Sequence, residues 1–279
     1  MRQYVVDAFT DQVFSGNQAA VCVMDAWPDE QLMMAIAREN NFSETAFTVR
    51  EPDGSYRLRW FTPTSEVDLC GHATLATSYV LFNFYEQDAS TICFHTTSSG
   101  DLFIGRRGDL IQMDFPAYKL HEVPVTSAME EATGARPSAA YLDRDLLLVY
   151  DSEDIVRDMH PSPESIEQLA GMAVAVTAPG TSHDCVSRFF APKIGIAEDP
   201  VTGSVHCMIG PYWGGRLGKS SISAYQASER GGEMLLELKA GPCARPRQGR
   251  ALLRGRAQPV APARPPCLSA VAAIDSARA

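Results

Sequence analysis

Three ionisable side chains of this sequence lie in patterns suited to proton transfer. Glu44 begins an apolar strand pattern, where burial would raise the pKa of its carboxyl towards the range used in acid–base catalysis. His72 follows Gly71 at the start of an apolar helix, where the imidazole could stay neutral and donate a hydrogen bond. Asp199 lies in an acidic loop. Structural roles stay open for each of them: a solvated strand-edge Glu, a helix-end His and a loop Asp bonded to nearby N–H groups.

Two apolar helices that each begin at a glycine must position these groups. The first runs from about His72 to Phe84, and the second starts near Gly203 and ends before Gly214. A helix start offers unpaired N–H groups and a positive dipole end, which bind carboxylate or phosphate. Two such starts facing each other could hold one anionic ligand, whereas the alternative is two ordinary buried helices with glycine at tight turns.

A weak internal repeat relates the two helices. Phe61-Thr62-Pro63 and Phe190-Ala191-Pro192 each precede an acidic loop, a glycine and an apolar helix, about 130 residues apart. This order favours two related halves. A third helix is expected over 28–40, where Pro28 suits the first turn. Strands alternate with these helices, so the fold class is α+β. The strand patterns cover 4–6, 19–24, 45–49, 56–60, 91–94, 102–104, 110–115, 146–150, 173–177 and 186–190.

Composition and motifs exclude several functions. The net charge of −10 disfavours binding to nucleic acid or to an anionic membrane, and no apolar run is long enough to cross a bilayer. Seven cysteines without a signal-peptide pattern or a C-x-x-C pair indicate reduced thiols in a cytoplasmic protein. Zinc-finger spacing is absent, so no metal site is expected. Gly214–Ser220 is not a P-loop, because its spacing is wrong and it ends a helix; we interpret its glycines as a helix C-cap.

The last forty residues differ from the rest of the chain. They hold seven Arg and one Asp and are rich in Ala and Pro, a composition that supports little packed structure. We expect an N-terminal lobe over 1–116, a C-terminal lobe over 117–258, and a tail over 259–279 that adds little to the core. A shifted reading frame and a genuine disordered tail both explain this composition.

Ordered motifs across residues 4 to 239 resemble the PhzF-like family of phenazine-biosynthesis and related isomerases. The motifs that carry the resemblance are Asp7-Ala8-Phe9-Thr10, Phe14–Val21, Ile36–Glu39, Ser43–Phe47, Arg59–Pro63, Glu66–Thr74, Ser187–Pro192, Gly195–Ser204 and Gln226–Gly232. The resemblance implies a fold like that of diaminopimelate epimerase, with two similar lobes, each a curled mixed β-sheet around a central helix, and a cleft between them.

The resemblance also implies a site and a reaction. Glu44 matches the family's acid/base residue, and His72 and Asp199 match its other polar site residues. The residues that match positions holding the substrate carboxylate or flanking the acid/base group are Ser43, Gly71, Gly203 and Ser204. The implied function is a biosynthetic isomerase that moves a proton on a small carboxylated substrate. The implied enzyme needs no cofactor and forms a homodimer.

Two other functions stay open. An amino-acid epimerase of the same fold would use two opposed thiols, one at each helix start. Cys70 is a possible reactive thiol, but Thr202 lies where its partner is expected, and Cys207 lies about one turn further on. A non-catalytic small-molecule-binding protein would keep the fold but would not need the intact set of Glu44, His72 and Asp199.

Overall fold

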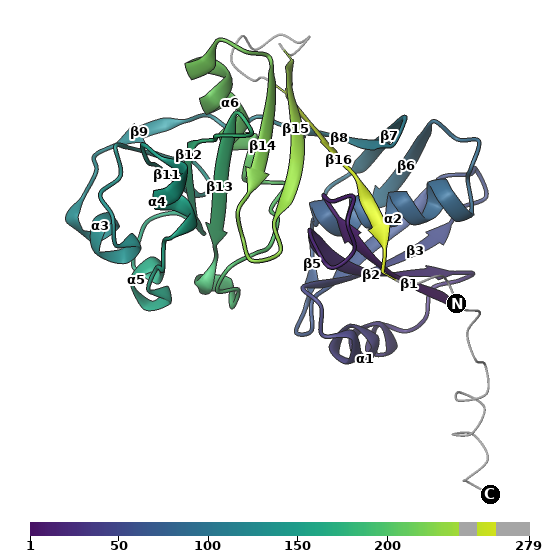
Figure 1. The fold of residues 1–279 in the computed structure, drawn as a ribbon. Helices are drawn as coiled ribbons and strands as arrows, with labels where there is room; N and C mark the ends of the chain where they lie inside the picture. Colours follow the sequence, from purple (N-terminus) through teal and green to yellow (C-terminus); the bar gives the residue numbers. More distant parts are fainter. Residues whose placement is uncertain (240–249, 261–279) are drawn as a thin grey trace, which may run out of the picture.

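The structure is a computed structural model that describes residues 1–239 and 250–260, and these residues form one continuous mixed sheet with six α-helices (Figure 1). The helices are α1 (Glu30–Asn40), α2 (Gly71–Phe84), α3 (Ser127–Thr133), α4 (Glu153–Arg157), α5 (Pro163–Glu167) and α6 (His206–Leu217). The first strands are β1 (Arg2–Ala8), β2 (Asn17–Met24), β3 (Glu44–Arg50), β4 (Tyr56–Phe61), β5 (Glu66–Val67), β6 (Thr91–Thr96), β7 (Asp101–Arg107) and β8 (Leu110–Pro116). The remaining strands are β9 (His121–Val123), β10 (Ala139–Leu142), β11 (Leu146–Val149), β12 (Val174–Pro179), β13 (Cys185–Phe190), β14 (Ser221–Gln226), β15 (Gly232–Lys239), β16 (Arg250–Gly255) and β17 (Ala257–Pro259).

The strands pair in the same order twice along the chain. Residues 1–116 are called here the N-terminal half. Its antiparallel strand pairs are β1–β2, β3–β4, β6–β7 and β7–β8, and its parallel pairs are β2–β3 and β4–β6. From residue 117, in the C-terminal half, β10–β11 through β15–β16 repeat the same series. The pairing order supports the two related halves that the sequence repeat predicts.

Two crossing strands join the halves. β16 pairs with β15 on one side and with β8 on the other, and β17 continues from it to pair with β1 (Figure 1). Because the sheet runs through both halves, the lobe boundaries at 116 and 258 stay a prediction. Most of the expected tail, 261–279, lies outside the described residues.

The core of each half surrounds one helix. In α2, ten of fourteen residues are buried, including Leu75, Val80 and Leu81, and α2 contacts β1, β2, β3, β8 and β17. α6 contacts β14, β15 and β16 in the same way. A helix that is apolar all round belongs in the interior of a domain. The α+β class and the curled sheet around a central helix are therefore confirmed.

The predicted end of the second central helix is wrong. Gly214 and Gly215 lie inside α6, which continues to Leu217 and is capped by Gly218 at φ +66°. Gly214 is needed for packing: a Cβ placed there would lie 2.2 Å from Leu238 Cδ1 and 3.0 Å from the Lys219 carbonyl oxygen. The helix start is also later than expected, because α6 begins at His206 after a hydrogen-bonded turn over 203–205.

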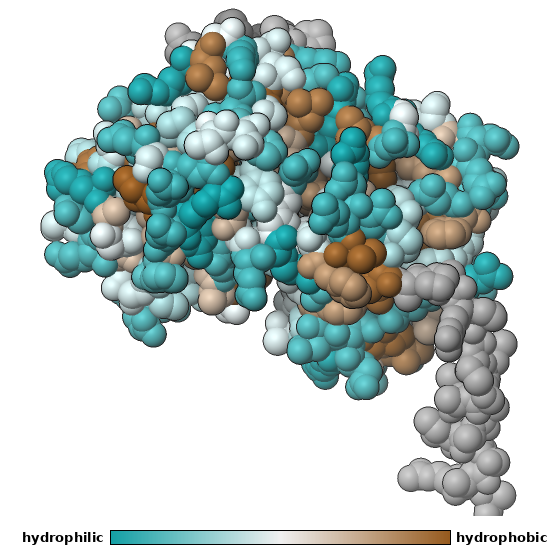
Figure 2. Space-filling view, viewed as in Figure 1, coloured by the Kyte–Doolittle hydropathy of each residue, from teal (hydrophilic) through white to brown (hydrophobic). Residues whose placement is uncertain are grey.

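The first helix follows the sequence pattern. α1 begins one residue after Asp29, whose carboxylate accepts a hydrogen bond from the Leu32 N–H at 2.8 Å, and its buried residues are Met33 and Ala37. The surface is largely hydrophilic on the face shown in Figure 2. No helix of the described residues is long and apolar enough to span a membrane.

Candidate active site

Glu44 and His72 meet at the centre of the candidate site. Glu44 is the first residue of β3, beside Ala19 of the parallel strand β2, and His72 is the second residue of α2. Glu44 Oε2 lies 3.1 Å from His72 Nε2, and their side chains are 13% and 8% exposed. Two residues on separate elements of the N-terminal half are thus brought together, as the family resemblance implies.

Asn17 connects this pair to Asp199 of the C-terminal half. Its Nδ2 donates to Asp199 Oδ1 at 2.8 Å and to the Val201 carbonyl oxygen at 3.0 Å, and it lies 3.3 Å from His72 Nδ1. Asn17 and Asp199 are 182 positions apart in the chain, and Asn17 is fully buried. One amide therefore holds the polar residues of both halves in a single group.

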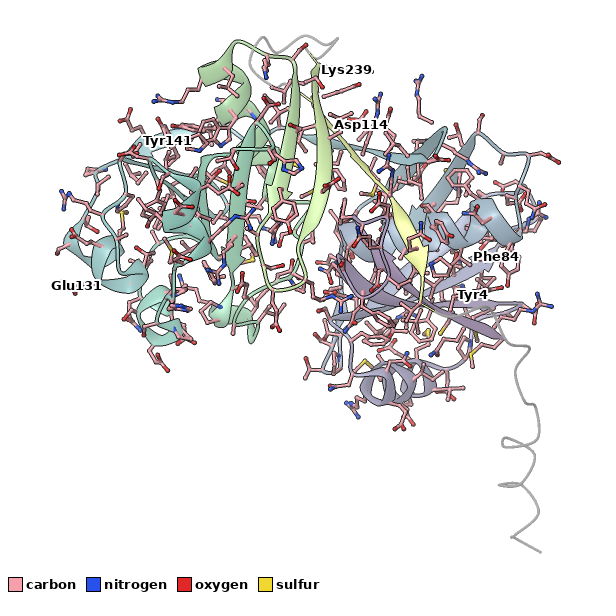
Figure 3. The ribbon with its side chains drawn as sticks, viewed as in Figure 1. Tyr4, Phe84, Asp114, Glu131, Tyr141 and Lys239 are labelled. Atoms are coloured by element: carbon pink, nitrogen blue, oxygen red, sulfur yellow. The ribbon has the colours of Figure 1, made fainter. Side chains whose placement is uncertain are left out.

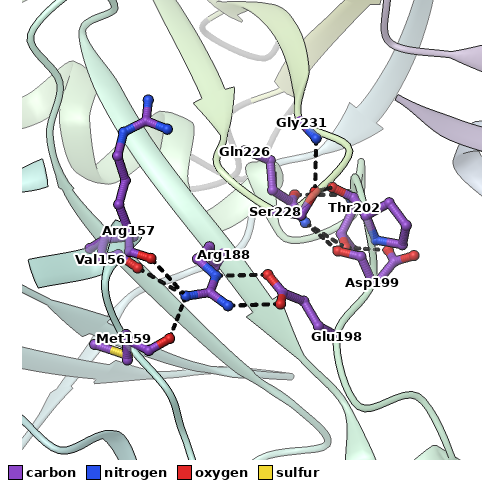
Figure 4. A network of polar contacts seen from close by, with 11 residues as sticks. Val156, Arg157, Met159, Arg188, Glu198, Asp199, Thr202, Gln226, Ser228 and Gly231 are labelled. Atoms are coloured by element: carbon purple, nitrogen blue, oxygen red, sulfur yellow. Dashed lines mark hydrogen bonds and ion pairs between the residues drawn. The ribbon is translucent and has the colours of Figure 1, made fainter. Parts of the chain in front are cut away.

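Hydrogen bonds from the C-terminal half fix the loop that carries Asp199. The Arg188 guanidinium makes a bidentate ion pair with Glu198 at 2.7 and 2.8 Å and donates to the Met159 carbonyl oxygen at 2.6 Å (Figure 4). Thr202 Oγ1 donates to Asp199 Oδ2, and Gln226 Nε2 donates to the Asp199 carbonyl oxygen at 2.7 Å. A bidentate guanidinium–carboxylate pair restricts the geometry of Glu198, the neighbour of Asp199. Together with the hydrogen bonds from Thr202 and Gln226, it holds Asp199 in one orientation.

Both helix starts lack a side-chain cap. The cap residues are Cys70 before α2 and Val205 before α6, and neither side chain bonds to the first N–H groups of its helix. Gly71 opens α2, and Gly203 and Ser204 lie in the turn that leads into α6. Uncapped helix starts with a glycine present N–H donors to an anion.

The charge of the Glu44–His72 pair differs from the sequence prediction. Burial favours the neutral carboxylic acid, but the positive charge of His72 and the polar contacts of Glu44 with His72 and Cys70 together outweigh it and lower the pKa of Glu44 below its usual 4.5. Burial likewise disfavours the imidazolium, but the interactions with Cys70 and Glu44 raise the pKa of His72 well above 6.5. These directions are opposite to the expected raised pKa of Glu44 and neutral His72, and they favour a carboxylate beside an imidazolium.

Burial acts in the opposite direction on the other two ionisable groups. It raises the pKa of Asp199, and the opposing effects of His72, Thr202 and Asn17 do not cancel it. Burial and the Glu44 charge also raise the pKa of the Cys70 thiol, whose Sγ lies 3.5 Å from His72 Nδ1. Cys70 is thus kept as a thiol rather than as the thiolate that a nucleophile or proton-abstracting sulfur requires.

Three buried polar atoms at this site have no hydrogen-bond partner among the residues that the structure describes. They are Glu44 Oε2, His72 Nε2 and Asn17 Oδ1; the contact between the first two has the distance of an ion pair but not the geometry of a hydrogen bond. Unpaired buried polar atoms are costly and often mark a functional site. The donor atoms of Glu44, Cys70 and His72 lie within 4.8 Å of one another, so this set could also hold a metal ion.

Sequence reasoning did not single out two residues of the site. Asn17 and Gln226 are both fully buried and both bond to Asp199. Each lies inside a motif that carries the family resemblance, and this position in a motif could have identified them as site residues. The half-buried Ser43 precedes Glu44 at the head of β3, as the sequence requires.

The fold and this site together define the class of protein. Solved structures with the same fold include a hydroxyproline epimerase from Agrobacterium vitis, with a TM-score of 0.59 at 9% identity, covering 93% of this chain and 92% of the epimerase. At that identity only the fold is shared. The chain therefore has the two-lobed fold that is also found in proline-type epimerases.

The chain belongs to the PhzC–PhzF family. A family model described as "Phenazine biosynthesis-like protein" matches residues 6–263. An Enterococcus faecalis protein of the PhzF family has a TM-score of 0.88 at 45% identity, with 93% of this chain and 96% of that chain covered. A Pseudomonas aeruginosa protein named an uncharacterized isomerase is 46% identical over 236 residues, which covers 85% of this chain and 90% of that protein. A Homo sapiens protein named "Phenazine biosynthesis-like domain-containing protein" is 38% identical, with 85% and 91% covered.

Proposed function

We propose that this protein is a cofactor-independent isomerase that moves a proton between two carbon atoms of a small carboxylated metabolite, with Glu44 as the acid/base. The observation that supports it best is the group of Glu44, His72 and Asn17, whose unpaired buried atoms provide hydrogen-bonding capacity for a ligand. The ionised state of Glu44 suits the first step, because a base must be deprotonated before it can accept a proton.

The proposed reaction needs one carboxylate and one anion-binding surface. The N–H groups at the starts of α2 and α6, including Gly71, Gly203 and Ser204, bind the substrate carboxylate. Glu44 then accepts a proton from a carbon next to unsaturation, and the electron pair of that C–H bond shifts into the conjugated system. The carboxyl proton exchanges with solvent, and Glu44 then protonates another carbon on the same face. His72 and Asp199 stabilise the charge that develops between these steps.

The pKa directions are compatible with this cycle. In the free site the imidazolium of His72 faces the Glu44 carboxylate. Substrate binding adds the negative charge of the substrate, and proton transfer then neutralises Glu44. The imidazolium therefore faces at least one anion throughout the cycle. The low pKa of Glu44 in the free site also favours release of the proton to the product. A carboxyl with a pKa near neutrality is therefore not required in the free enzyme.

An amino-acid epimerase is the second candidate, and one contact disfavours it. A second thiol is expected at Thr202, but Thr202 carries a hydroxyl that donates to Asp199 Oδ2. Cys207 is buried inside α6. One thiol with a raised pKa does not supply the pair of opposed bases that two-thiol epimerisation uses.

A ligand screen followed by isotope exchange tests the proposal. Thermal shift against a library of carboxylated metabolites identifies binders, and each binder is then incubated with the protein in D₂O. We expect an isomerised product in which deuterium enters at carbon, with stereochemistry retained. Inverted stereochemistry at one carbon would favour the epimerase. Binding without isomerisation or exchange would favour a binding protein. The homodimer implied by the resemblance is tested separately by sedimentation equilibrium.

A further inference from the structure

A second group of potential metal ligands lies on the outer face of the N-terminal half. Cys93 and His95 are two residues apart on β6, and Asp101 is the register partner of His95 on β7. Successive strand residues point to opposite faces, so Cys93 and His95 share one face while Ile92 and Phe94 lie in the core. The cross-strand pair His95–Asp101 places the carboxylate on that same face.

The three side chains converge. One donor atom from each of Cys93, His95 and Asp101 lies within 4.8 Å of the others, and His95 Nδ1 lies 2.7 Å from Asp101 Oδ1. All three residues line a surface hollow of about 440 Å³, together with Asp53 and Glu86. Glu44, Cys70 and His72 do not line this hollow, so the cluster is separate from the candidate active site.

Several carboxylates surround the cluster. Asp101 contacts His95, and the negative charges of Asp53 and Glu51 also act on its imidazole. Glu86, which lines the hollow, is paired with Arg50. Arg57, the β4 register partner of His95, is paired with Glu51 at 2.7 Å. A cation in the hollow would therefore be attracted by carboxylates.

We propose that Cys93, His95 and Asp101 form a surface site for a divalent transition-metal ion of the Zn²⁺ type, with Asp53 or water in the fourth position. A thiolate, an imidazole and a carboxylate are the ligand types that zinc takes in four-coordinate sites. Binding replaces protons: the Cys93 thiol and any imidazolium of His95 each release one proton to solvent as the metal bond forms. The ion would link β6 to β7 and stabilise this hairpin.

Titration of the full-length metal-free protein tests the site. Zn²⁺ binding is measured by calorimetry, and Co²⁺ binding by the absorption band that a thiolate–cobalt bond produces. Loss of a residue that only hydrogen-bonds to a metal ligand already lowers metal affinity about 10–100-fold. Loss of a ligand itself should cost at least as much, so we expect Cys93→Ser and His95→Gln each to weaken Zn²⁺ binding at least about tenfold. Cys93→Ser should also abolish the cobalt band. Zn²⁺ should raise the Tm of the parent and not that of Cys93→Ser.

Two matched variants separate this cluster from the other cysteines and histidines. Cys70→Ser removes the thiol of the Glu44–Cys70–His72 set, and His183→Gln removes a half-buried imidazole of the C-terminal half. Both should bind Zn²⁺ like the parent. The proposal is overturned if the parent does not bind, if Cys93→Ser and His95→Gln bind unchanged, or if only Cys70→Ser loses the ion. Thermal unfolding of the metal-free variants establishes that each is folded.

Discussion

At the scale of single residues, the candidate site holds buried polar atoms that have no hydrogen-bond partner among the described residues; the other such atoms belong to Trp60 and Asp145. Glu44, His72 and Asn17 contribute one such atom each, while most other polar side chains in the core, such as Thr74 and Thr77, bond to nearby carbonyl oxygens. Retaining unpaired buried groups costs stability, and a bound substrate that pairs them recovers part of that cost. Residue-scale predictions therefore concern turnover and pH dependence.

Glu44→Gln should separate binding from catalysis. The amide keeps the shape and hydrogen-bonding reach of the side chain but cannot carry a proton to and fro. We expect substrate affinity similar to that of the parent and a loss of about 10²- to 10⁴-fold in kcat. Glu131→Gln is the control, since Glu131 is an exposed residue of α3 in the C-terminal half (Figure 3). Unchanged turnover in Glu44→Gln would remove Glu44 from the mechanism and direct attention to Cys70.

His72→Asn should move the acid limb of the pH profile. In the parent, the positive charge of His72 keeps the pKa of Glu44 below 4.5, so kcat/KM should decline only when the pH falls through that lowered value. Without the imidazolium, burial alone acts on Glu44 and raises its pKa. The variant should therefore lose kcat/KM at higher pH than the parent on the acid side. An acid limb at the same pH in both proteins would show that His72 does not set the ionisation of Glu44.

At the scale of elements, the buried central helices depend on contacts that their sequences alone do not specify. α6 is attached at its start by His206, whose Nδ1 lies 2.7 Å from the Thr202 carbonyl oxygen and whose Nε2 lies 3.4 Å from Ser187 Oγ. Further along α6, Gly214 packs directly against β15. We therefore expect the free energy of unfolding to depend on pH through His206 and on side-chain volume at Gly214.

His206 should make the protein less stable as the pH falls. Burial lowers the pKa of His206 to about 4, so between pH 6.5 and 4 the unfolded chain binds a proton that the folded protein does not. The free energy of unfolding therefore decreases over this window, by up to about 3 kcal/mol from this residue. His206→Asn removes the titrating group. Urea denaturation across the window should show a shallower decrease for the variant, and equal slopes would contradict the expectation.

Neighbouring glycines of α6 should respond oppositely to alanine. At Gly214 a Cβ would overlap Leu238 and crowd the Lys219 carbonyl oxygen, whereas at Gly215 nothing lies within 4 Å of it. Gly214→Ala should lower the free energy of unfolding by about 1–3 kcal/mol, as overpacking does. Gly215→Ala should raise it by up to about 1 kcal/mol through helix propensity. Stabilisation of both variants in urea denaturation would show that β15 moves away from α6 at little cost.

At the scale of the whole molecule, hydrogen bonds from the segment over 10–16 connect the halves. Gly16 N–H donates to the Gly231 carbonyl oxygen at 2.8 Å, and Thr10 N–H donates to the Arg256 carbonyl oxygen at 3.2 Å. Within the N-terminal half, Tyr4 of β1 stacks on Phe84 at the end of α2, with ring centroids 5.2 Å apart (Figure 3). Because the candidate site is assembled from both halves, we expect their connection to affect the proposed catalysis as well.

Arg230→Met should weaken this connection. Arg230 donates to Asp7 Oδ1 at 2.6 Å, to the Gly16 carbonyl oxygen at 2.8 Å and to the Ser15 carbonyl oxygen at 3.0 Å. Asp7 is fully buried, so removing the guanidinium leaves its carboxylate with the hydrogen bond from the Phe14 N–H but without its counter-charge, and breaking a buried ion pair typically costs about 3–5 kcal/mol. The exposed pair Arg136–Glu130 provides the control, and Arg136→Met should change stability by less than about 1 kcal/mol. Equal effects of the two variants would show that Arg230 does not join the halves.

Local patterns determined the elements that carry the site. The glycine before His72 and the strand alternation near Glu44 each involve interactions between residues close in the chain, and both were predictable. Short elements such as β9, β10 and α3 were missed, since segments of three to seven residues give little periodic signal. The end of α6 was also missed, because Gly214 is there to admit Leu238 from a strand more than twenty positions later.

Only the tertiary structure decided the chemistry of the site. The motifs indicated that Glu44, His72 and Asp199 belong together, but not that Asn17 would join them across 182 positions. The sequence also indicated that Glu44 is buried, from which a raised pKa follows. Its pKa is lowered instead, because the folded chain places His72 Nε2 3.1 Å away, and the interaction between charges in a poorly solvated site depends on a distance that no local pattern contains.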